Sequence, residues 1–264
     1  MRQETSHANQ MSTAASPLAT VGVVVPCFNE AHRLDPARFL ALTAAGASVL
    51  FVNDGSTDRT RSVLDLACAK HSGLTYHSLP VNRGKGEAVR FGMLQMIDDG
   101  VDVVCFIDAD LATPVEELLR IIDHLLRSRT TRVAIGSRVR LMGMHVERSM
   151  PRHYLSRLFA TFASLTLREK IYDTQCGAKV FRVDDRLLKA LSTPFRTRWV
   201  FDIELLNRLL SYTKEHEDHP DPGIREVPLE EWAEVPGSKL TLGGMSRALV
   251  DLLRLEVLRR QGRA

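Results

Sequence analysis

The amino-acid sequence predicts an α/β protein with a mixed, mostly parallel sheet flanked by helices. Two observations support this fold class: from residue 21 onward short β-rich runs alternate with helix-like segments, and polar residues follow the ends of several of these runs. The expected strands are VGVVVPCF (21–28), SVLFVND (48–54), LTYHSLP (74–80), VDVVCFID (101–108) and RVAIGS (132–137).

Helix-like segments separate these strands. They are TDRTRSVLDLACAK (57–70), with an N-cap expected from the cluster 56–58, GKGEAVRFGMLQMIDDG (84–100), and PVEELLRIIDHLLRS (114–128), with Pro114 expected in the first turn. The alternation weakens after about residue 140. There the sequence predicts a helix over 152–167, two further helices, and a short strand in IREVPLEEW (224–232).

Three regions are expected along the chain. Residues 1–18 are polar and lack the apolar core of a signal peptide, so they are predicted to form a disordered tail. Residues 19–244 are expected to form the main folded domain. Residues 245–264 carry five arginines against two acidic residues and predict a basic amphipathic helix, which suits a peripheral contact with an anionic membrane surface.

Composition narrows the functional class. The 264 residues are 44% hydrophobic and 25% charged with a net charge of +3, which is typical of a globular protein and too weakly basic for a dedicated nucleic-acid binder. Cys27, Cys68, Cys105 and Cys176 show no paired spacing, which favours a reducing cytosol. No apolar run reaches the roughly 18 residues that span a bilayer, so any membrane association is expected to be peripheral.

The stretch VDVVCFIDADLATP (101–114) ends in two carboxylates separated by one residue. In an extended chain Asp108 and Asp110 point to the same side and repel each other unless a positive charge lies between them. Mg²⁺ typically takes one or two carboxylates plus phosphate oxygens, so Mg²⁺ or Mn²⁺ on a diphosphate fits this pair. Taken alone, the pair also fits a solvated loop before a helix. A phosphatase that uses a D-x-D nucleophile is another alternative, but its motif is expected on the first strand.

Two more loops carry polar residues. Asn53 and Asp54 end the second strand, and Gly55 permits a tight turn. In NRGKGEAVRFG (82–92) two glycines flank Lys85 at a helix start, which suits contact with an anion. The segment is neither a Walker A motif nor G-x-G-x-x-G, which disfavours P-loop enzymes and Rossmann dehydrogenases. Ligands of such sheets bind beyond the carboxyl ends of the strands, where Asn29, Glu30, Asn53, Asp54, Asp108 and Asp110 fall.

The motifs in combination resemble a known family. In this order, VVPCFNE, VNDGSTD, NRGKG and DADLATP resemble the nucleotide-sugar domain of family 2 glycosyltransferases, which have the Rossmann-like GT-A fold. Four later motifs resemble the branch that includes dolichyl-phosphate glucosyltransferase and related polyprenyl-phosphate glycosyltransferases: GSR, DTQCGAKVFR, RWVFDIELL and EVPGSKL. The resemblance covers roughly residues 20 to 255. Ala112 stands where the phosphomannose branch has Gln, which favours the glucose-type branch.

The resemblance implies roles for individual residues. The implied nucleotide-sugar site comprises Pro26, Phe28, Glu30, Asp54, Lys85, Asp108, Gln175 and Gly177, with Asp54 accepting a hydrogen bond from the base. The implied metal ligands are Asp108 and Asp110, the implied acceptor-phosphate residues are Arg138, Arg152 and Arg157, and the implied catalytic residues are Asp202, Asp173 and Arg138.

The implied reaction is inverting, metal-dependent transfer of a hexosyl group from a UDP-glucose-like donor to a polyprenyl phosphate at the cytoplasmic membrane face. A phosphate acceptor is already ionised at neutral pH, whereas a hydroxyl acceptor needs a general base, for which Asp202 is the first candidate and Glu204 the second. At their i, i+2 spacing on a helix, at most one of these two is expected to face the site. The alternatives are a soluble family 2 glycosyltransferase with a hydroxyl acceptor and a non-catalytic nucleotide-sugar-binding protein.

Overall fold

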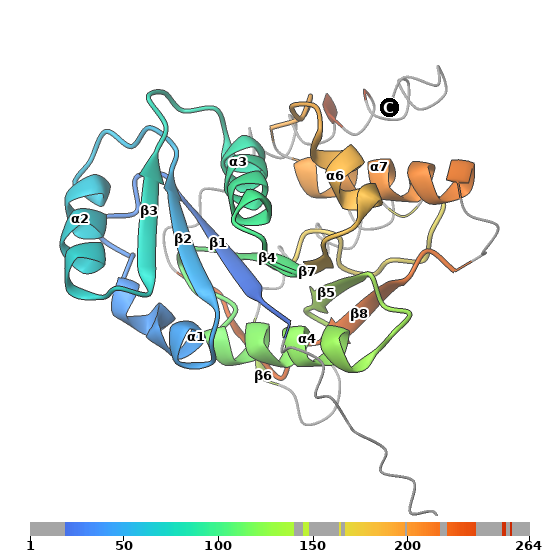
Figure 1. Ribbon diagram of the computed structural model, residues 1–264, viewed down its shortest axis with the longest axis horizontal. Helices are drawn as coiled ribbons and strands as arrows, with labels where there is room; N and C mark the ends of the chain where they lie inside the picture. The colour runs from blue at the N-terminus through green and yellow to red at the C-terminus, as the bar shows by residue number, and fades with distance from the viewer. Residues whose placement is uncertain are drawn as a thin grey trace, which may run out of the picture.

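A seven-stranded β-sheet forms the centre of the computed structural model, in the strand order β3-β2-β1-β4-β7-β5-β8 (Figure 1). The structure describes residues 19–139, 145–147, 164, 167–198, 200–216, 221–235, 250–251 and 254. The strands of the sheet are β1 (Val21–Cys27), β2 (Ser48–Asn53), β3 (Leu74–Ser78), β4 (Val103–Ile107), β5 (Val133–Ser137), β7 (Ala178–Arg182) and β8 (Ile224–Pro228). A second, two-stranded parallel sheet pairs β6 (His145–Glu147) with β9 (Glu231–Ala233).

The strand directions make the large sheet mixed and mostly parallel, as the sequence predicts. β1 pairs in parallel with β2 and β4, β2 with β3, and β5 with β8. β7 alone is inverted and lies antiparallel between β4 and β5, with Ala178 opposite Ile107. The first residue of β7 therefore lies at the edge where β4 and β5 end.

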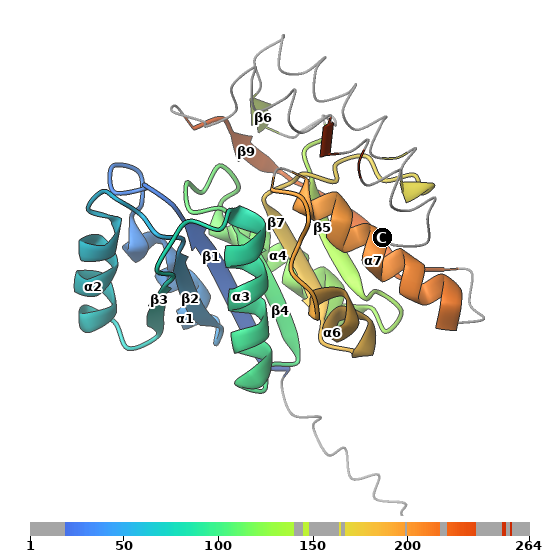
Figure 2. The same cartoon turned by 90° about the horizontal axis from the view of Figure 1, so that it is seen from above.

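Helices cover both faces of the sheet (Figure 2). They are η1 (Pro36–Phe39), α1 (Leu40–Ala44), α2 (Thr60–Lys70), α3 (Lys85–Asp98), α4 (Val115–Arg127), α6 (Asp185–Leu191) and α7 (Phe201–His216). α3 packs on β1, β2 and β4 and contacts α6, while α4 packs on β5 and β7 and contacts α1 on the opposite face.

Apolar spacing explains this packing. α4 buries Leu118, Ile121, Ile122 and Leu125, whose i, i+3, i+4, i+7 positions form one helical stripe. All five residues of β4 are buried, as expected for a strand covered on both faces. Gly92 lets α3 approach the sheet, because a Cβ at this position would lie 2.5 Å from Cγ1 of Val24.

The five strands expected up to residue 137 all form, whereas η1 and α1 were not expected. α2 begins at Thr60 with Arg59 as its N-cap, and Asp58 instead accepts from the Thr60 N–H at 2.9 Å. Pro114 is the N-cap residue of α4 and not part of its first turn.

Several predicted segments fall outside the described residues. These are the tail 1–18, all but two residues of the predicted helix 152–167, and all but three of the C-terminal segment 245–264. Ser164 and Leu167 are helical, as are Val250, Asp251 and Arg254. In the described part of the chain, every helix is too short or too polar to cross a lipid bilayer.

Candidate active site

Asp108 immediately follows β4 and faces two other segments of the chain. Its Oδ1 lies 2.5 Å from Nζ of Lys85, and its N–H donates to the carbonyl oxygen of Gly177 at 3.1 Å. A Cβ on Gly177 would lie only 2.3 Å from Oδ2 of Asp108. The absence of a side chain at residue 177 is therefore what leaves room for the Asp108 carboxylate.

Asp110 lies two residues further along the same turn. Its Oδ1 accepts from the Ala112 N–H at 3.2 Å, and its Oδ2 lies 3.6 Å from Nη1 of Arg33. Burial and the nearby charge of Asp108 raise the pKa of Asp110 above its usual value. The two carboxylates therefore act on each other, as their spacing predicts, and each has a cation of the chain beside it.

The carboxylate pair fits a hard divalent cation. Both ligands are oxygens, and their side chains keep 33% and 22% exposure, so substrate oxygens can approach. Among the residues described, no cluster of three or more His, Cys, Asp or Glu side chains occurs. The donor set is thus the kind that Mg²⁺ or Mn²⁺ completes with phosphate oxygens and water.

Lys85 is the first residue of α3, and Asp54 orders the loop before it. Asp54 is 2% exposed, and its carboxylate accepts from the N–H groups of Arg83 at 2.7 Å and Gly84 at 2.8 Å and from Nδ2 of Asn82 at 3.0 Å. Gly84 has φ +98°, a conformation that glycine adopts without strain. A nucleotide base that donated a hydrogen bond directly to Asp54, as the resemblance implies, would compete with these three hydrogen bonds.

The electrostatic environment keeps Lys85 charged. Burial opposes its ionisation, but the carboxylates of Asp108 and Asp202 outweigh it and raise the pKa of Lys85. Its Nζ also lies 5.8 Å from the ring centre of Phe201 and 6.0 Å from that of Phe106, within the range of a cation–π contact.

Arg138 and Asp173, two of the implied catalytic residues, form a bidentate ion pair. Nε and Nη2 of Arg138 lie 2.6 and 2.7 Å from the Asp173 oxygens, and the Arg138 N–H donates to Oδ2 at 3.0 Å. The Asp173 N–H in turn donates to Glu226 of β8 at 2.8 Å. Burial opposes the charge of Arg138, but Asp173 outweighs it and, with a further contribution from Asp108, raises the pKa of Arg138.

Asp202 and Glu204 point to different surroundings, as their spacing predicts. Oδ1 of Asp202 accepts from Nζ of Lys179 at 2.6 Å, and Lys179 is fully buried. Glu204 accepts from the Thr197 N–H at 3.0 Å and from Nη2 of Arg208 at 2.7 Å. Of the two carboxylates, Asp202 is the one whose charge reaches Lys85.

The loops after β1 and β2 are joined by hydrogen bonds. The Asn29 N–H donates to Oγ of Ser56 and the Thr57 N–H donates to Oδ1 of Asn29, each at 2.9 Å. Pro26 lies within β1, Phe28 directly follows that strand, and Glu30 is buried one residue beyond Asn29. Gln175 lies half-buried two residues before Gly177. Arg152 and Arg157 lie outside the described residues.

The sequence interpretation missed Arg33 and Lys179. Arg33 stands three residues after Glu30, and an E-x-x-R spacing within one turn is a recognisable signal for an ion pair. Lys179 interrupts the apolar run AKVF, and a lysine in a buried strand indicates a paired carboxylate elsewhere in the chain. Neither signal names the second partner, because that depends on the fold.

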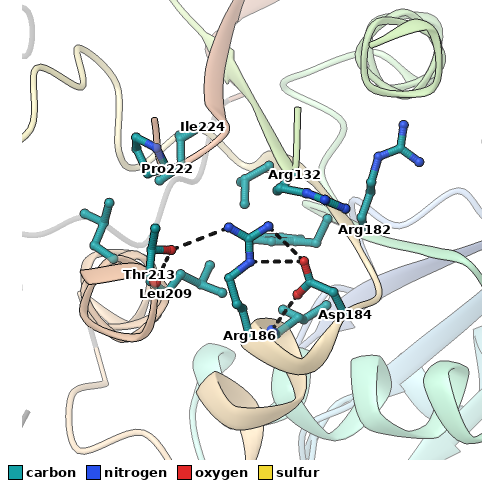
Figure 3. A pocket seen from close by; sticks show the side chains of 12 residues that line it. Arg132, Arg182, Asp184, Arg186, Leu209, Thr213, Pro222 and Ile224 are labelled. Carbon is teal, nitrogen blue, oxygen red and sulfur yellow. Dashed lines mark hydrogen bonds and ion pairs between the residues drawn. The ribbon is translucent and has the colours of Figure 1, made fainter. Parts of the chain in front are cut away.

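A small pocket lies at the opposite edge of the sheet, near the start of β5 and the end of β7 (Figure 3). Charged and apolar side chains line it together, and Arg186 in it donates to Asp184 at 3.0 Å and to Oγ1 of Thr213 at 3.5 Å. This pocket is separate from the candidate active site, which lies where β1, β2 and β4 end and β7 begins.

The mixed sheet with a carboxylate pair at its carboxyl edge is the architecture expected of a GT-A glycosyltransferase. The model of the family "Glycosyl transferase family 2" matches residues 22–187, so the chain belongs to this family and is an enzyme of the glycosyltransferase class. The family resemblance and the enzyme class expected from the sequence are both confirmed.

Curated relatives cover most of the chain. It is 36% identical over 244 residues to dolichyl-phosphate β-glucosyltransferase of Drosophila melanogaster, covering 86% of this chain and 71% of the relative. It is 32% identical over 244 residues to dolichyl-phosphate β-glucosyltransferase of Saccharomyces cerevisiae, covering 84% and 69%. It is 32% identical over 254 residues to dolichyl-phosphate β-glucosyltransferase ALG5C of Trichomonas vaginalis, covering 90% and 71%.

Solved structures share the fold. Glucosyl-3-phosphoglycerate synthase of M. tuberculosis superposes with a TM-score of 0.61 at 19% identity, covering 93% of this chain and 82% of that one. The same enzyme in complex with Mn²⁺ and UDP-glucose has a TM-score of 0.60 at 21% identity, covering 90% and 79%. The expected GT-A fold is confirmed by this similarity.

Proposed function

We propose that this protein transfers a hexosyl group, with glucose from UDP-glucose as the leading donor, to a polyprenyl phosphate such as dolichyl phosphate. The observation that carries the proposal is the meeting of Asp108, Asp110 and Lys85 at the carboxyl edge of the sheet, within the electrostatic reach of Arg138. The names of the curated relatives, which specify glucose and dolichyl phosphate for those proteins, support the choice of substrates.

The reaction is a displacement at the anomeric carbon of the sugar. An acceptor phosphate oxygen forms a bond to C1, the bond from C1 to the diphosphate oxygen breaks, and the electron pair leaves with the diphosphate through an oxocarbenium-like transition state. A β-linked product from an α-linked nucleotide sugar requires inversion, which a single displacement provides. A phosphate monoester has a second pKa near 6, so the acceptor attacks without first losing a proton.

The chain's own residues hold the two substrates. Lys85 lies at the start of a helix, where exposed N–H groups and an ammonium group favour the donor's phosphates. Arg138, oriented by Asp173, presents a planar guanidinium suited to the acceptor phosphate. A divalent cation held by Asp110 and Asp108 would offset the charge that develops on the leaving diphosphate.

The remaining implied residues would surround the donor. We propose that Pro26, Phe28 and Glu30 border the nucleotide and that Gln175 and Gly177 border the sugar. Asp54 would serve the nucleotide through loop 82–84, because its oxygens already bind that loop. Arg152 and Arg157 would add to the acceptor-phosphate site. Because the acceptor is a lipid, the proposal includes a peripheral membrane contact through residues 245–264.

The test is release of nucleoside diphosphate from a panel of nucleotide sugars with Mn²⁺ or Mg²⁺, with and without dolichyl phosphate. Release from UDP-glucose that requires both the metal and the lipid phosphate is the expected result. Release that no lipid phosphate increases would contradict the proposed acceptor and would direct the search to hydroxyl compounds.

A hydroxyl acceptor is the second candidate, and Asp202, whose charge acts on Lys85 at the site, is the carboxylate to test for it. A general base there would abstract the acceptor proton, and its loss would lower kcat on the order of 10²-fold or more. If Asp202→Asn retains a near-normal rate, the hydroxyl mechanism that uses Asp202 is excluded.

A further inference from the structure

The Arg33 side chain lies between a buried glutamate and the carboxylate pair. Its Nε and Nη2 lie 2.8 and 2.7 Å from the two oxygens of Glu30, and its Nη1 lies 3.6 Å from Oδ2 of Asp110. The side chain is 20% exposed. A two-pronged contact of this kind fixes the plane of the guanidinium as well as its position.

The backbone makes this arrangement rigid. The Glu30 N–H donates to Oγ1 of Thr60 at 2.8 Å, and the Glu30 carbonyl accepts from the N–H groups of Arg33 at 2.9 Å and Leu34 at 2.8 Å. Glu30 is only 7% exposed. Both oxygens of its carboxylate accept from Arg33, so this carboxylate holds the guanidinium in place while Glu30 borders the proposed nucleotide site.

Each carboxylate of the pair therefore has a cation of the chain beside it, Lys85 beside Asp108 and Arg33 near Asp110. These cations offset the repulsion between the two carboxylates that the sequence predicts, but they also repel an incoming divalent cation. A diphosphate removes this conflict, because its oxygens can bind the metal and the guanidinium at once.

Building on the proposed function, we infer that Arg33 binds the donor's diphosphate and makes the divalent metal and the nucleotide sugar bind together. Glu30 is its positioning residue. Without the donor, the positive charge of Arg33 near Asp110 would weaken metal binding; with the donor bound, the negative charge of the diphosphate would offset it. Metal and donor each then raise the affinity for the other.

The test measures two affinities of Arg33→Gln. Mn²⁺ binding without nucleotide is followed by EPR titration and is expected to tighten about tenfold, because one nearby positive charge is gone. UDP-glucose binding at saturating Mn²⁺ is followed by calorimetry and is expected to weaken at least about tenfold, because the phosphate contact is gone. A purely structural role for Arg33 would weaken both.

Arg90→Gln is the matched control. Arg90 also pairs with a glutamate at i, i+3, Glu87, and its side chain is 18% exposed, but it lies on the flank of α3 and donates to the Leu191 carbonyl. Neither affinity is expected to change in this variant.

A second variant, Glu30→Gln, keeps the Arg33 guanidinium but removes the two-pronged ion pair that orients it. Donor affinity is expected to fall several-fold while Mn²⁺ affinity without nucleotide does not rise. Unchanged donor affinity in both Arg33→Gln and Glu30→Gln, or Mn²⁺ binding in Arg33→Gln that is no tighter than in the wild type, would overturn the inference. If the wild type itself binds no nucleotide sugar with Mn²⁺, the proposed function fails, and the Mn²⁺ titration alone still tests whether Arg33 opposes the metal.

Discussion

Nζ of Lys179 lies 2.6 Å from Oδ1 of Asp202, and the two side chains are 1% and 8% exposed. Lys179 comes from β7 and Asp202 from the first turn of α7, so this pair joins the inverted strand to the helix that covers it. The Lys179 ammonium also donates to the Cys176 carbonyl at 2.7 Å and lies 5.2 Å from the ring centre of Phe106. The pair therefore links the sheet, the helix and the segment that precedes Gly177.

Removing one member of this pair should cost more than removing both. Lys179→Met leaves the Asp202 charge buried without its partner, and we expect the free energy of unfolding to fall by about 3–5 kcal/mol. Lys179→Met combined with Asp202→Leu should recover most of this loss. Urea unfolding of the two variants measures the difference. Equal losses in both would show that the pair does not act as a unit.

Gly177→Ala should lower activity while leaving the fold intact. The added methyl group would overlap the Asp108 carboxylate and force that side chain out of place, and a displacement of about 1 Å in a catalytic constellation costs on the order of 10²-fold in rate. kcat/KM with UDP-glucose measures the effect. Gly100→Ala is the control: at φ +86° with no atom within 4 Å, it should cost about 1–2 kcal/mol of stability and leave the rate unchanged.

Asp54→Asn should weaken donor binding through loop 82–84. In Asn one carboxylate oxygen is replaced by an NH₂ group that cannot accept, so the N–H of Arg83 or that of Gly84 loses its acceptor, and a hydrogen bond to a charged group contributes about 1.5–3 kcal/mol. We expect faster hydrogen exchange at these two amides and a higher KM for the nucleotide sugar. In Asp184→Asn, which alters the N-cap of α6 at the other edge of the sheet, KM should stay at the wild-type value.

The Asp58 carboxylate should give the protein an acid-sensitive contribution to stability. Burial opposes its ionisation, but hydrogen bonds from Thr60 and Ala31 outweigh it and hold the pKa of Asp58 below its usual value of 3.8. A lowered pKa in the folded state stabilises the fold above pH 3.8, and this stabilisation disappears as the pH falls through the folded-state pKa. The difference in unfolding free energy between wild type and Asp58→Asn should therefore be constant near neutral pH and shrink below pH 3.8. A difference that grows in acid would contradict the assignment.

The sequence predicts much of the sheet because its signals are local. The runs that became β1, β2 and β4 are apolar and end in polar residues, so their edge could be identified without knowing their neighbours. The same reasoning placed six polar residues at one end of the sheet, because the carboxyl ends of parallel strands meet there: Asn29, Glu30, Asn53, Asp54, Asp108 and Asp110.

The direction of β7 and the pairing of charges could not be predicted in this way. AKVFR has the same apolar pattern whichever way it runs, and only its hydrogen bonds to β4 and β5 decide its direction. Likewise, nothing local to Arg138 indicates that Asp173 meets it, since their contact depends on how the chain returns to the sheet. Partners distant in sequence are set by topology, which periodicity does not encode.

The inverted strand also brings both ends of one long segment of the chain to the same end of the sheet. The chain leaves the sheet at Ser137 and re-enters it at Ala178 on the neighbouring strand, so the whole segment 138–177 starts and finishes at one edge. The length of this segment therefore does not set the register between β5 and β7, although β6 within it pairs with β9. The segment carries Arg138, which we propose holds the acceptor phosphate, together with its partner Asp173, and it also carries Gly177 beside Asp108. Replacement of this one segment is therefore expected to affect the acceptor side and the donor side of the site together.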